Sequence, residues 1–290
     1  MHELGKRTEG YLERSAGVRL YTCEWVPDVP VAASAPARAL VVLMHGYGEH
    51  CRRYDPFAEF LLTRGHGVCR FDARGHGRSL GQRGYIHAYS EYVADLAAYV
   101  AQVSVAHPGA PIVLMGHSNG GLTAIRAVQE GLAPVQALVL TSPLLGLRRQ
   151  RKPVPDGLAR LLSWGAARLP LPNGIRSSDL THDQDMRDAH AADRWRHGVA
   201  TPRWYWSTTL AGRQALAAAQ QVTLPLLVVR ADLDPIVDPA RVAKFYEGAA
   251  SLDKQLVTRT GEFHEVLNEV NRRELFVLIA DWLERVGHAA

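Results

Sequence analysis

The pentapeptide Gly116-His117-Ser118-Asn119-Gly120 restricts the folding of this chain more than any other feature. An apolar run, Ile112–Met115, precedes it, and a stretch with helical character, Gly121–Gln129, follows it. A serine held at a sharp turn between a strand and a helix leaves no room for side chains two residues before and after it, so glycine is needed at both positions. The pattern predicts a strand–turn–helix unit that exposes the Ser118 hydroxyl as a candidate nucleophile.

Short apolar runs alternate with helical patterns over much of the chain. Because these runs are almost continuously apolar, they are typical of strands buried on both faces, as in a parallel sheet. Together with the turn at Ser118, the alternation predicts an α/β-hydrolase fold, with a mostly parallel central sheet and helices on both faces. The expected strands are Leu40–Met44, Val68–Phe71, Ile112–Met115, Ala137–Leu140, Leu226–Val229 and Gln255–Val257, and the expected helices are Pro56–Arg64, Glu91–Ala106 and Gly121–Gln129.

The two ends of the chain are expected to belong to the same unit. A hairpin of Gly10–Arg14 and Val18–Trp25 is predicted first, with a turn at Ser15-Ala16-Gly17. The last helix is predicted over Asn268–Val286, where apolar residues recur with helical spacing.

The alternation stops after Ser142-Pro143, and no strand-like run occurs from about Gly146 to Val222. Short helices are expected there at Gly157–Arg168 and Gln214–Gln221. An insertion of this size predicts a helical cap over the carboxyl ends of the strands, where open α/β sheets bind ligands. The expected organisation is a hydrolase core at 1–145, a cap at 146–222 and the rest of the core at 223–290.

The amino-acid composition adds little to this prediction of the fold. A hydrophobic content of 47%, a charged content of 21% and a net charge of +4 are typical of a globular protein, and no nucleic-acid-binding module is visible. The basic run Arg148–Lys152 is interpreted as a solvated face or, less favoured, as an attraction to anionic lipid or an acidic substrate. Three scattered cysteines and no apolar leader favour a cytoplasmic protein without disulfides, metal or organic cofactor.

A serine nucleophile needs a base that an acid orients, and in this fold the chain order is serine, acid, histidine. Three aspartates follow the strand Leu226–Val229, and Asp234 is the expected acid because Ile236 and Val237 behind it can anchor its loop. Asp232 is assigned instead to the turn, and Asp238 to the start of a helix. His264 lies on the loop after the last predicted strand and is the expected base.

An ester-cleaving site also needs two preorganised N–H groups for the negative charge that develops on the substrate oxygen. The backbone N–H of Asn119, directly after the nucleophile, is one candidate. The other is the backbone N–H of Tyr47, in the glycine-rich loop His45-Gly46-Tyr47-Gly48-Glu49-His50.

Four stretches of the chain resemble the monoacylglycerol lipases and related lysophospholipases: 45–54 (HGYGEHCRRY), 72–79 (DARGHGRS), 116–121 (GHSNGG) and 264–269 (HEVLNE). The family commonly has Met where this chain has Asn119. The resemblance implies a cytosolic or membrane-associated serine hydrolase of lipid monoesters. It also implies Ser118, Asp234 and His264 as the triad, with Tyr47 and Asn119 as oxyanion donors.

Substrate choice is expected to depend on the cap. Glu49, Leu144, Trp204 and Trp206 are the candidate substrate-binding residues. A further apolar group is interpreted either as an acyl channel or, preferably, as the core of the cap, and comprises Leu158, Leu161, Leu162, Trp164 and Leu169.

The leading hypothesis is a serine carboxylester hydrolase for a small lipid monoester, with transient membrane-surface contact through the cap. The sequence carries no indication of the oligomeric state. One alternative is a peptidase like the proline iminopeptidases, which need carboxylates for a free amine. The cap offers Asp179, Asp183, Asp185, Asp188 and Asp193 for that purpose. A non-catalytic binding protein on the same fold is a third hypothesis.

Overall fold

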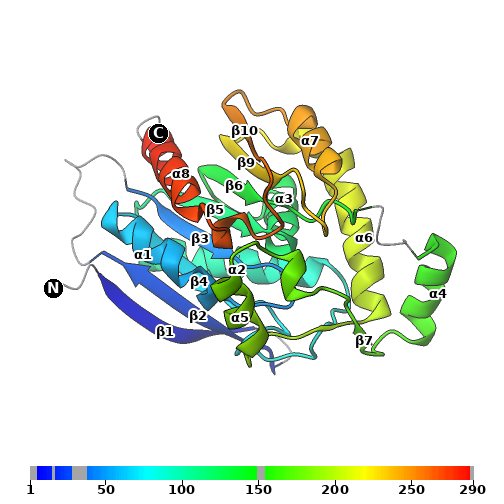
Figure 1. Cartoon of the computed structure of the whole chain (residues 1–290). Helices are drawn as coiled ribbons and strands as arrows, with labels where there is room; N and C mark the ends of the chain where they lie inside the picture. Colours follow the sequence, from blue (N-terminus) through cyan, green and yellow to red (C-terminus); the bar gives the residue numbers. More distant parts are fainter. Residues whose placement is uncertain (1–4, 15–16, 28–37, 149–153, 288–290) are drawn as a thin grey trace.

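A central eight-stranded sheet runs through the molecule in the order β1-β2-β4-β3-β5-β6-β9-β10. The computed structural model describes residues 5–14, 17–27, 38–148 and 154–287. The first two strands are antiparallel to their neighbours and the other six are parallel. Figure 1 shows the sheet between two layers of helices. The predicted fold, a mostly parallel sheet with helices on both faces, is confirmed.

The predicted strands are all present, with small differences at their ends. Five of the six parallel strands are almost wholly buried, which explains their nearly continuous apolar sequences. The hairpin at the start of the chain is also confirmed, although residues 15–16 of its turn lie outside the described residues. The strands are β1 (Lys6–Glu13), β2 (Arg19–Val26), β3 (Leu40–Met44), β4 (Gly67–Phe71), β5 (Ile112–His117), β6 (Ala137–Thr141), β9 (Leu226–Ala231) and β10 (Lys254–Arg259).

Alternate residues of each parallel strand contribute to two hydrophobic cores, one on each face of the sheet. On one face, Val41 and Leu43 of β3 pack in a core with α1 (Asp55–Thr63) and α8 (Arg272–Gly287). The opposite face is covered by four helices. These are α2 (Ser90–Ala106), α3 (Asn119–Gln129), α6 (Pro202–Ala217) and α7 (Pro239–Gly248).

The start of the last helix differs from its prediction. Instead of a continuous helix from Asn268, a short 3₁₀ turn, η5 (Val266–Asn268), comes first, and α8 begins only at Arg272. The buried Glu269 carboxylate accepts from the Thr181 hydroxyl of another loop, which also donates to the backbone oxygen of Asn268, and the Asn268 side chain donates to Glu265. These tertiary contacts therefore hold the chain in a non-helical path that periodicity alone does not reveal.

The segment between β6 and β9 was predicted less accurately. It contains the expected helix α4 (Asp156–Gly165), but also α5 (Gln184–Ala192), which was missed. The helix expected at Gln214–Gln221 is instead the end of α6 followed by a 3₁₀ turn, η4 (Ala219–Gln221). Two-residue strands, β7 (Leu171–Pro172) and β8 (Val199–Ala200), pair here, so the expectation of no strand was wrong. Such short strands leave no periodic signal.

Parallel strands bring several loops to one edge of the sheet. The chain leaves β3, β5, β9 and β10 at their carboxyl ends, so the loops that carry residues 45–50, Ser118, Asp234 and His264 all start from this edge. Ser118 follows β5 directly and has φ 51° and ψ −115°, one of the two non-glycine residues with positive φ in the described chain. A serine in this conformation is strained, and the packing around it must hold it there.

Glycine at position 120 allows α3 to start against the end of β3. A Cβ atom there would lie well under 3.0 Å from the carbonyl oxygens of Met44 and His45, which are backbone atoms without freedom to move aside. We predict that Gly120→Ala lowers the free energy of unfolding by about 2 kcal/mol or more, because the helix must shift. Denaturant titration measures this change.

Gly157→Ala is the matched control, because a Cβ at this helical position would meet nothing within 4 Å. It should leave stability unchanged or raise it by up to about 1 kcal/mol through better helix propensity. Equal stabilities for the two variants would contradict the packing argument.

Candidate active site

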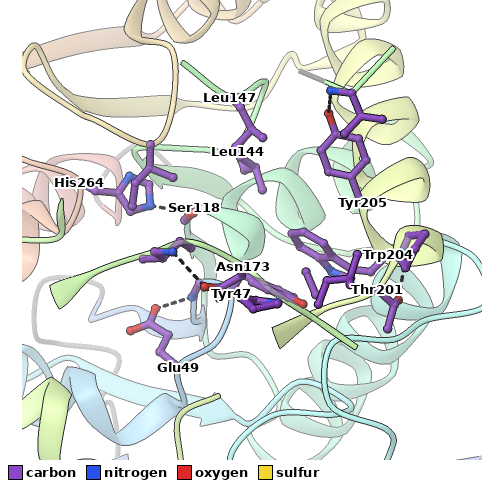
Figure 2. A pocket seen from close by; sticks show the side chains of 18 of the residues that line it. Tyr47, Glu49, Ser118, Leu144, Leu147, Asn173, Thr201, Trp204, Tyr205 and His264 are labelled. Carbon is purple, nitrogen blue, oxygen red and sulfur yellow. Dashed lines mark hydrogen bonds between the residues drawn. The ribbon is translucent and has the colours of Figure 1, made fainter. Parts of the chain in front are cut away.

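Ser118, His264 and Asp234 form a hydrogen-bonded chain in the structure. His264 Nε2 lies 2.9 Å from Ser118 Oγ, and His264 Nδ1 lies 2.7 Å from Asp234 Oδ2. All three side chains are at least nine-tenths buried. Figure 2 shows His264 turned toward Ser118 at one end of the cavity. The sequence-predicted residues are thus brought together in the order that a serine nucleophile requires.

The surroundings of Asp234 keep it ionised and oriented. Its Oδ1 accepts hydrogen bonds from the backbone N–H groups of Ile236 and Val237, at 2.8 and 2.9 Å, which leaves Oδ2 for His264. Burial alone raises the pKa of Asp234, but His264 and these N–H groups outweigh it, and the pKa is lowered. Burial lowers the pKa of His264, and the Asp234 charge and hydrogen bond reverse this, so the pKa is raised.

The other two aspartates of this loop have the local contacts expected of them. Asp232 Oδ1 accepts from Gly261 N–H at 2.8 Å and so joins the two loops that carry Asp234 and His264. Asp238 caps the N-terminus of α7 through the N–H of Ala240. Neither carboxylate contacts His264, so Asp234 alone of the three is in position to orient it.

The loop after β3 lies against Ser118. A Cβ on Gly46 would come within 3.2 Å of Ser118 Cβ, so the backbone passes close to the serine. Among the described residues, the backbone N–H groups of Tyr47 and Asn119 donate no hydrogen bond to the protein. Both predicted oxyanion donors therefore have a backbone N–H group without a protein acceptor. Asn119 directly follows Ser118 in the chain, and Tyr47 follows Gly46, which lies against Ser118.

Side-chain contacts hold both donors in position. The Tyr47 ring stacks on Trp204 with centroids 3.6 Å apart, and its hydroxyl donates to Val199 O at 2.7 Å. The Tyr89 hydroxyl lies 3.1 Å from both the backbone oxygen and the Oδ1 of Asn119. Asn119, where the resembled family commonly has Met, thus uses its polar side chain in a buried hydrogen bond beneath the turn.

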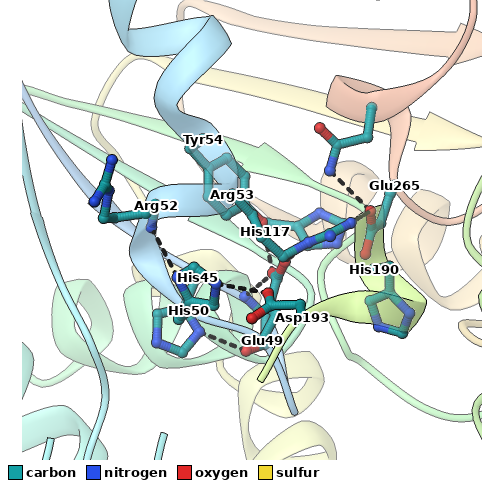
Figure 3. Close-up of polar contacts among 12 residues, drawn as sticks. His45, Glu49, His50, Arg52, Arg53, Tyr54, His117, His190, Asp193 and Glu265 are labelled. Carbon is teal, nitrogen blue, oxygen red and sulfur yellow. Dashed lines mark hydrogen bonds and ion pairs between the residues drawn. The ribbon is translucent and has the colours of Figure 1, made fainter. Parts of the chain in front are cut away.

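A buried ionic cluster lies behind this loop and was not recognised in the sequence. Glu49 accepts from Gly46 N–H at 2.6 Å, from the Tyr54 hydroxyl at 2.7 Å and from Arg53 Nε at 3.1 Å. Arg53 Nη2 donates to Glu265, the neighbour of His264. Figure 3 shows Arg53 between the two carboxylates. The cluster connects the loop that carries Tyr47 with the loop that carries His264.

Charge pairing dominates the electrostatics of the cluster. Burial raises the pKa of Glu265, but the Arg53 charge in first place, followed by His117 and a hydrogen bond from Asn268, lowers it to about 2. The pKa of Arg53 is raised because the two carboxylates outweigh its burial. Burial and the nearby His264 lower the pKa of His117 to about 4, so this ring is neutral near pH 7.

The segment between β6 and β9 is joined to this edge by further polar contacts. His50 Nε2 lies 2.7 Å from Asp193 Oδ2, directly beyond α5. Glu269 accepts from the His182 backbone N–H at 3.0 Å and from the Phe263 N–H at 2.9 Å. These bonds link both loops of the site to the same overlying segment.

A cavity of about 360 Å³ opens from Ser118 and His264 beneath this segment, and its lining is mainly apolar (Figure 2). Of the predicted substrate-binding residues, Leu144 and Trp204 line it. Glu49 also lines it, although its carboxylate oxygens are engaged in the cluster described above.

The prediction that Trp206 lines the site is wrong. Trp206 follows Trp204 by two residues on α6, which is roughly 200° around a helix. Its side chain therefore faces a separate groove beside His87 and Tyr89. Residues two positions apart on a helix point to nearly opposite sides of it, so Trp204 and Trp206 cannot both face the cavity.

The apolar residues around α4 also differ from their preferred interpretation. Leu158, Leu161 and Trp164 are 48%, 68% and 73% exposed, so they do not form a core of this segment. Leu162 does line the cavity, as do several residues that the sequence did not single out. These are Val154, Asn173, Ile175, Leu180 and Thr201. No motif marks them, because apolar and small polar residues in loops carry no signal of what they face.

Fold and site together define the class of the α/β-hydrolases. Residues 35–271 match the model of the Hydrolase_4 family, described as serine aminopeptidase, S33, and the chain belongs to this family. It is 30% identical to a monoacylglycerol lipase of Mycolicibacterium smegmatis over 96% of this chain and 97% of that relative.

Two further proteins are similar over most of their length. A phospholipase of Bacillus subtilis, YtpA, is 30% identical over 87% of this chain and 95% of its own. The crystal structure of a monoacylglycerol lipase from Paleococcus ferrophilus superposes with a TM-score of 0.81 at 27% identity, covering 92% of this chain and 99% of that one. The resemblance to monoacylglycerol lipases is confirmed.

The ionic cluster predicts a specific acid sensitivity. Since the folded-state pKa of Glu265 is about 2 against an ordinary 4.5, its stabilisation is complete above pH about 4.5 and is lost as the pH falls toward 2. We predict that Glu265→Gln costs about 3 kcal/mol at pH 7, because it leaves Arg53 buried with one carboxylate fewer. It should also reduce the slope of unfolding free energy against pH in this window, as measured by denaturant titration.

The control is Glu247→Gln, an exposed carboxylate on α7 far from the cluster. It should keep both the stability and the slope of the wild type. A slope that is the same in all three proteins would show that Glu265 ionisation does not stabilise the fold.

Proposed function

We propose that this protein is a serine carboxylester hydrolase for monoacylglycerol-like or lysophospholipid-like substrates. The observation that carries the proposal is the hydrogen-bonded series Ser118–His264–Asp234 at the end of a largely apolar cavity. A reactive hydroxyl and an apolar chamber in contact with it suit an ester that carries an acyl chain.

In the proposed reaction, Ser118 Oγ attacks the ester carbonyl carbon while its proton passes to His264 Nε2. Asp234 accepts the hydrogen bond of the other ring nitrogen, Nδ1, and stabilises the imidazolium that results, consistent with the raised pKa of His264. The proton then moves to the leaving alcohol as the carbon–oxygen bond breaks. Water, deprotonated by His264, attacks the acyl-enzyme, and the acid leaves as Ser118 regains its proton.

The backbone N–H groups of Tyr47 and Asn119 are proposed to bind the oxygen that becomes negative during each attack. Two observations support this role. Neither N–H group has a protein acceptor among the described residues, and contacts with Glu49, Trp204 and Tyr89 hold the backbone that carries them. Donors that are already oriented need no rearrangement when charge develops, and each contributes roughly 3 kcal/mol to lowering the barrier.

We assign residues 146–222 the role of a cap that selects the substrate. Within the described residues, this segment supplies more than half of the cavity lining, including Leu162, Ile175, Leu180 and Trp204. Few of the cavity-lining residues from this segment are polar. The Asn173 amide oxygen accepts from Ile175 N–H, which leaves the amide NH₂ group of Asn173 to meet the alcohol part of a substrate.

A peptidase that holds a free amine is less well supported. None of the five cap aspartates proposed for that role lines the cavity, and Asp183 and Asp193 are paired with Arg272 and His50. The carboxylates that do line it, Glu49 and Glu265, are both engaged in ion pairs with Arg53. A non-catalytic binding protein would need no hydrogen-bonded acid, base and nucleophile, so this alternative is also disfavoured.

One activity panel tests the proposal. We predict turnover of p-nitrophenyl esters and of monoacylglycerols, no turnover of prolyl arylamides, and labelling of Ser118 by a fluorophosphonate. Ser118→Ala should lower ester turnover by roughly 10⁴-fold or more while the fold is retained. His264→Ala should do the same.

Ser142→Ala is the matched control, because Ser142 is also buried and also has a positive φ of 43°, but it has no contact with His264. It should keep most of the activity. Arylamide turnover without ester turnover would favour the peptidase, and no activity with no labelling would favour the binding protein.

We also propose that the cap meets lipid surfaces transiently. Among the described residues, no helix is both long and apolar enough to span a bilayer. Leu158, Leu161 and Trp164 are exposed on α4, and other residues of the same helix line the cavity. These exposed apolar side chains suit shallow burial in a membrane interface. Through this contact a lipid monoester would pass from the membrane into the cavity without first dissolving in water.

Vesicle binding measures this contact. On vesicles of phosphatidylcholine with phosphatidylglycerol, Leu161→Ser with Trp164→Ser should weaken co-sedimentation on the order of tenfold or more. Full burial of each large apolar side chain would contribute about 1.5–3 kcal/mol, and shallow burial contributes only part of it. Val105→Ser, at an 83% exposed position on α2, is the control and should bind like the wild type. Equal binding by all three proteins would exclude α4 as the membrane contact.

A further inference from the structure

Three side chains with metal-binding atoms meet at a place that the proposed reaction does not use. They are Glu24 on β2, Cys69 on β4 and His107 at the end of α2. One ligand atom of each lies within 4.8 Å of the other two. The three residues are far apart in the sequence and form no short-spaced motif, so only the fold brings them together.

The sheet and one helix define this cluster. Glu24 and Cys69 are directly paired across the antiparallel strands β2 and β4. The Cys69 side chain is fully buried in the core that α2 covers, and α2 ends at His107, whose backbone N–H still donates to Val103 O at 2.9 Å. Two paired strands and a helix end therefore fix the three positions relative to one another.

His107 Nε2 is buried and has no hydrogen-bond partner among the described residues. The nearest carboxylate oxygen, Glu24 Oε2, lies 3.6 Å away, which is too long for a hydrogen bond. The second oxygen of Glu24 accepts from the Tyr99 hydroxyl at 3.5 Å, and this contact leaves Oε2 directed at the imidazole. A buried ring nitrogen without a partner is costly and calls for an explanation.

We propose that Glu24, Cys69 and His107 bind a zinc ion. Thiolate, imidazole and carboxylate are the ligands that Zn²⁺ prefers, and its usual bond lengths place tetrahedral ligand atoms roughly 3.3–3.6 Å apart. The 3.6 Å between His107 Nε2 and Glu24 Oε2 already matches this spacing. On binding, the Cys69 thiol loses its proton to solvent, the zinc–sulfur bond forms, and water completes the fourth position.

The proposed zinc site lies away from Ser118 and takes no part in ester hydrolysis. α2 starts beside the nucleophile, where Tyr89 contacts Asn119, and runs back to the opposite edge of the sheet, where β5 begins at Ile112. Zinc at His107 would join β2, β4 and α2 at that edge. It should stabilise the folded chain by mass action and leave the geometry at Ser118 unchanged.

The test uses the full chain after removal of bound metal with a chelator. Zn²⁺ titration, followed calorimetrically, should give one site per chain and a zinc-dependent rise in Tm. Co²⁺ at the same site should give a thiolate-to-cobalt charge-transfer band together with the visible bands of a tetrahedral ion. Ester turnover should be the same with and without Zn²⁺ at this site.

Two variants identify the ligands. His107→Gln and Cys69→Ser should each weaken Zn²⁺ binding at least tenfold and abolish the Tm rise, and Cys69→Ser should remove the charge-transfer band. The partly exposed His107 makes the first variant informative even if the buried Cys69→Ser variant is unstable. His87→Gln, at an exposed histidine, is the control for adventitious binding and should bind like the wild type.

Absence of Zn²⁺ binding by the wild type would overturn the proposal. So would equal binding by the wild type and His107→Gln, or a Co²⁺ spectrum without the thiolate band. None of these results bears on Ser118, so the proposed hydrolase function is tested separately.

Discussion

The arrangement at the catalytic edge depends on the close approach of α3 to the end of β3, which a missing side chain at Gly120 permits. This approach sets the start of the helix directly against the carbonyl groups from which the loop of Tyr47 departs. It also forces the turn at Ser118 into a positive φ, and the backbone hydrogen bonds of Ser118 to Thr141, Leu122 and Leu144 hold it there. The strained conformation of Ser118 is therefore held by β6, by α3 and by the loop after β6.

A second constraint comes from charge. Arg53 lies between Glu49 and Glu265, and these residues come from opposite ends of the sequence, so the cluster forms only when the sheet is complete. Buried charges stabilise a fold little in themselves, but an incomplete set is costly, which penalises any arrangement that separates the two loops. The loop of Tyr47 and the loop of His264 are therefore positioned by the same interaction, and neither can move without leaving a buried charge unpaired.

The sequence predicted what depends on local pattern. Continuous apolar runs identified the parallel strands, and the chain order of Ser118, Asp234 and His264 placed three residues that the structure brings into contact. The cluster around Arg53 was not predicted because Arg53 and Glu265 are 212 residues apart, and the motifs that contain them do not indicate that the two side chains pair. Trp206 was misassigned because its direction depends on the rotation of α6, which the sequence does not fix.

The same distinction explains why the reaction is easier to infer than the substrate. Nucleophilic attack needs hydrogen bonds between particular atoms, so few residue types in few positions satisfy it, and these leave readable motifs. An acyl chain needs only apolar volume, which Leu162, Ile175, Leu180 or many other side chains supply equally well. Selectivity among esters must therefore reside in the shape of the cavity and in its few polar groups. If the proposed function holds, Asn173, with its amide NH₂ group near the loop of Gly48, is the residue of this segment whose chemistry would distinguish one alcohol from another.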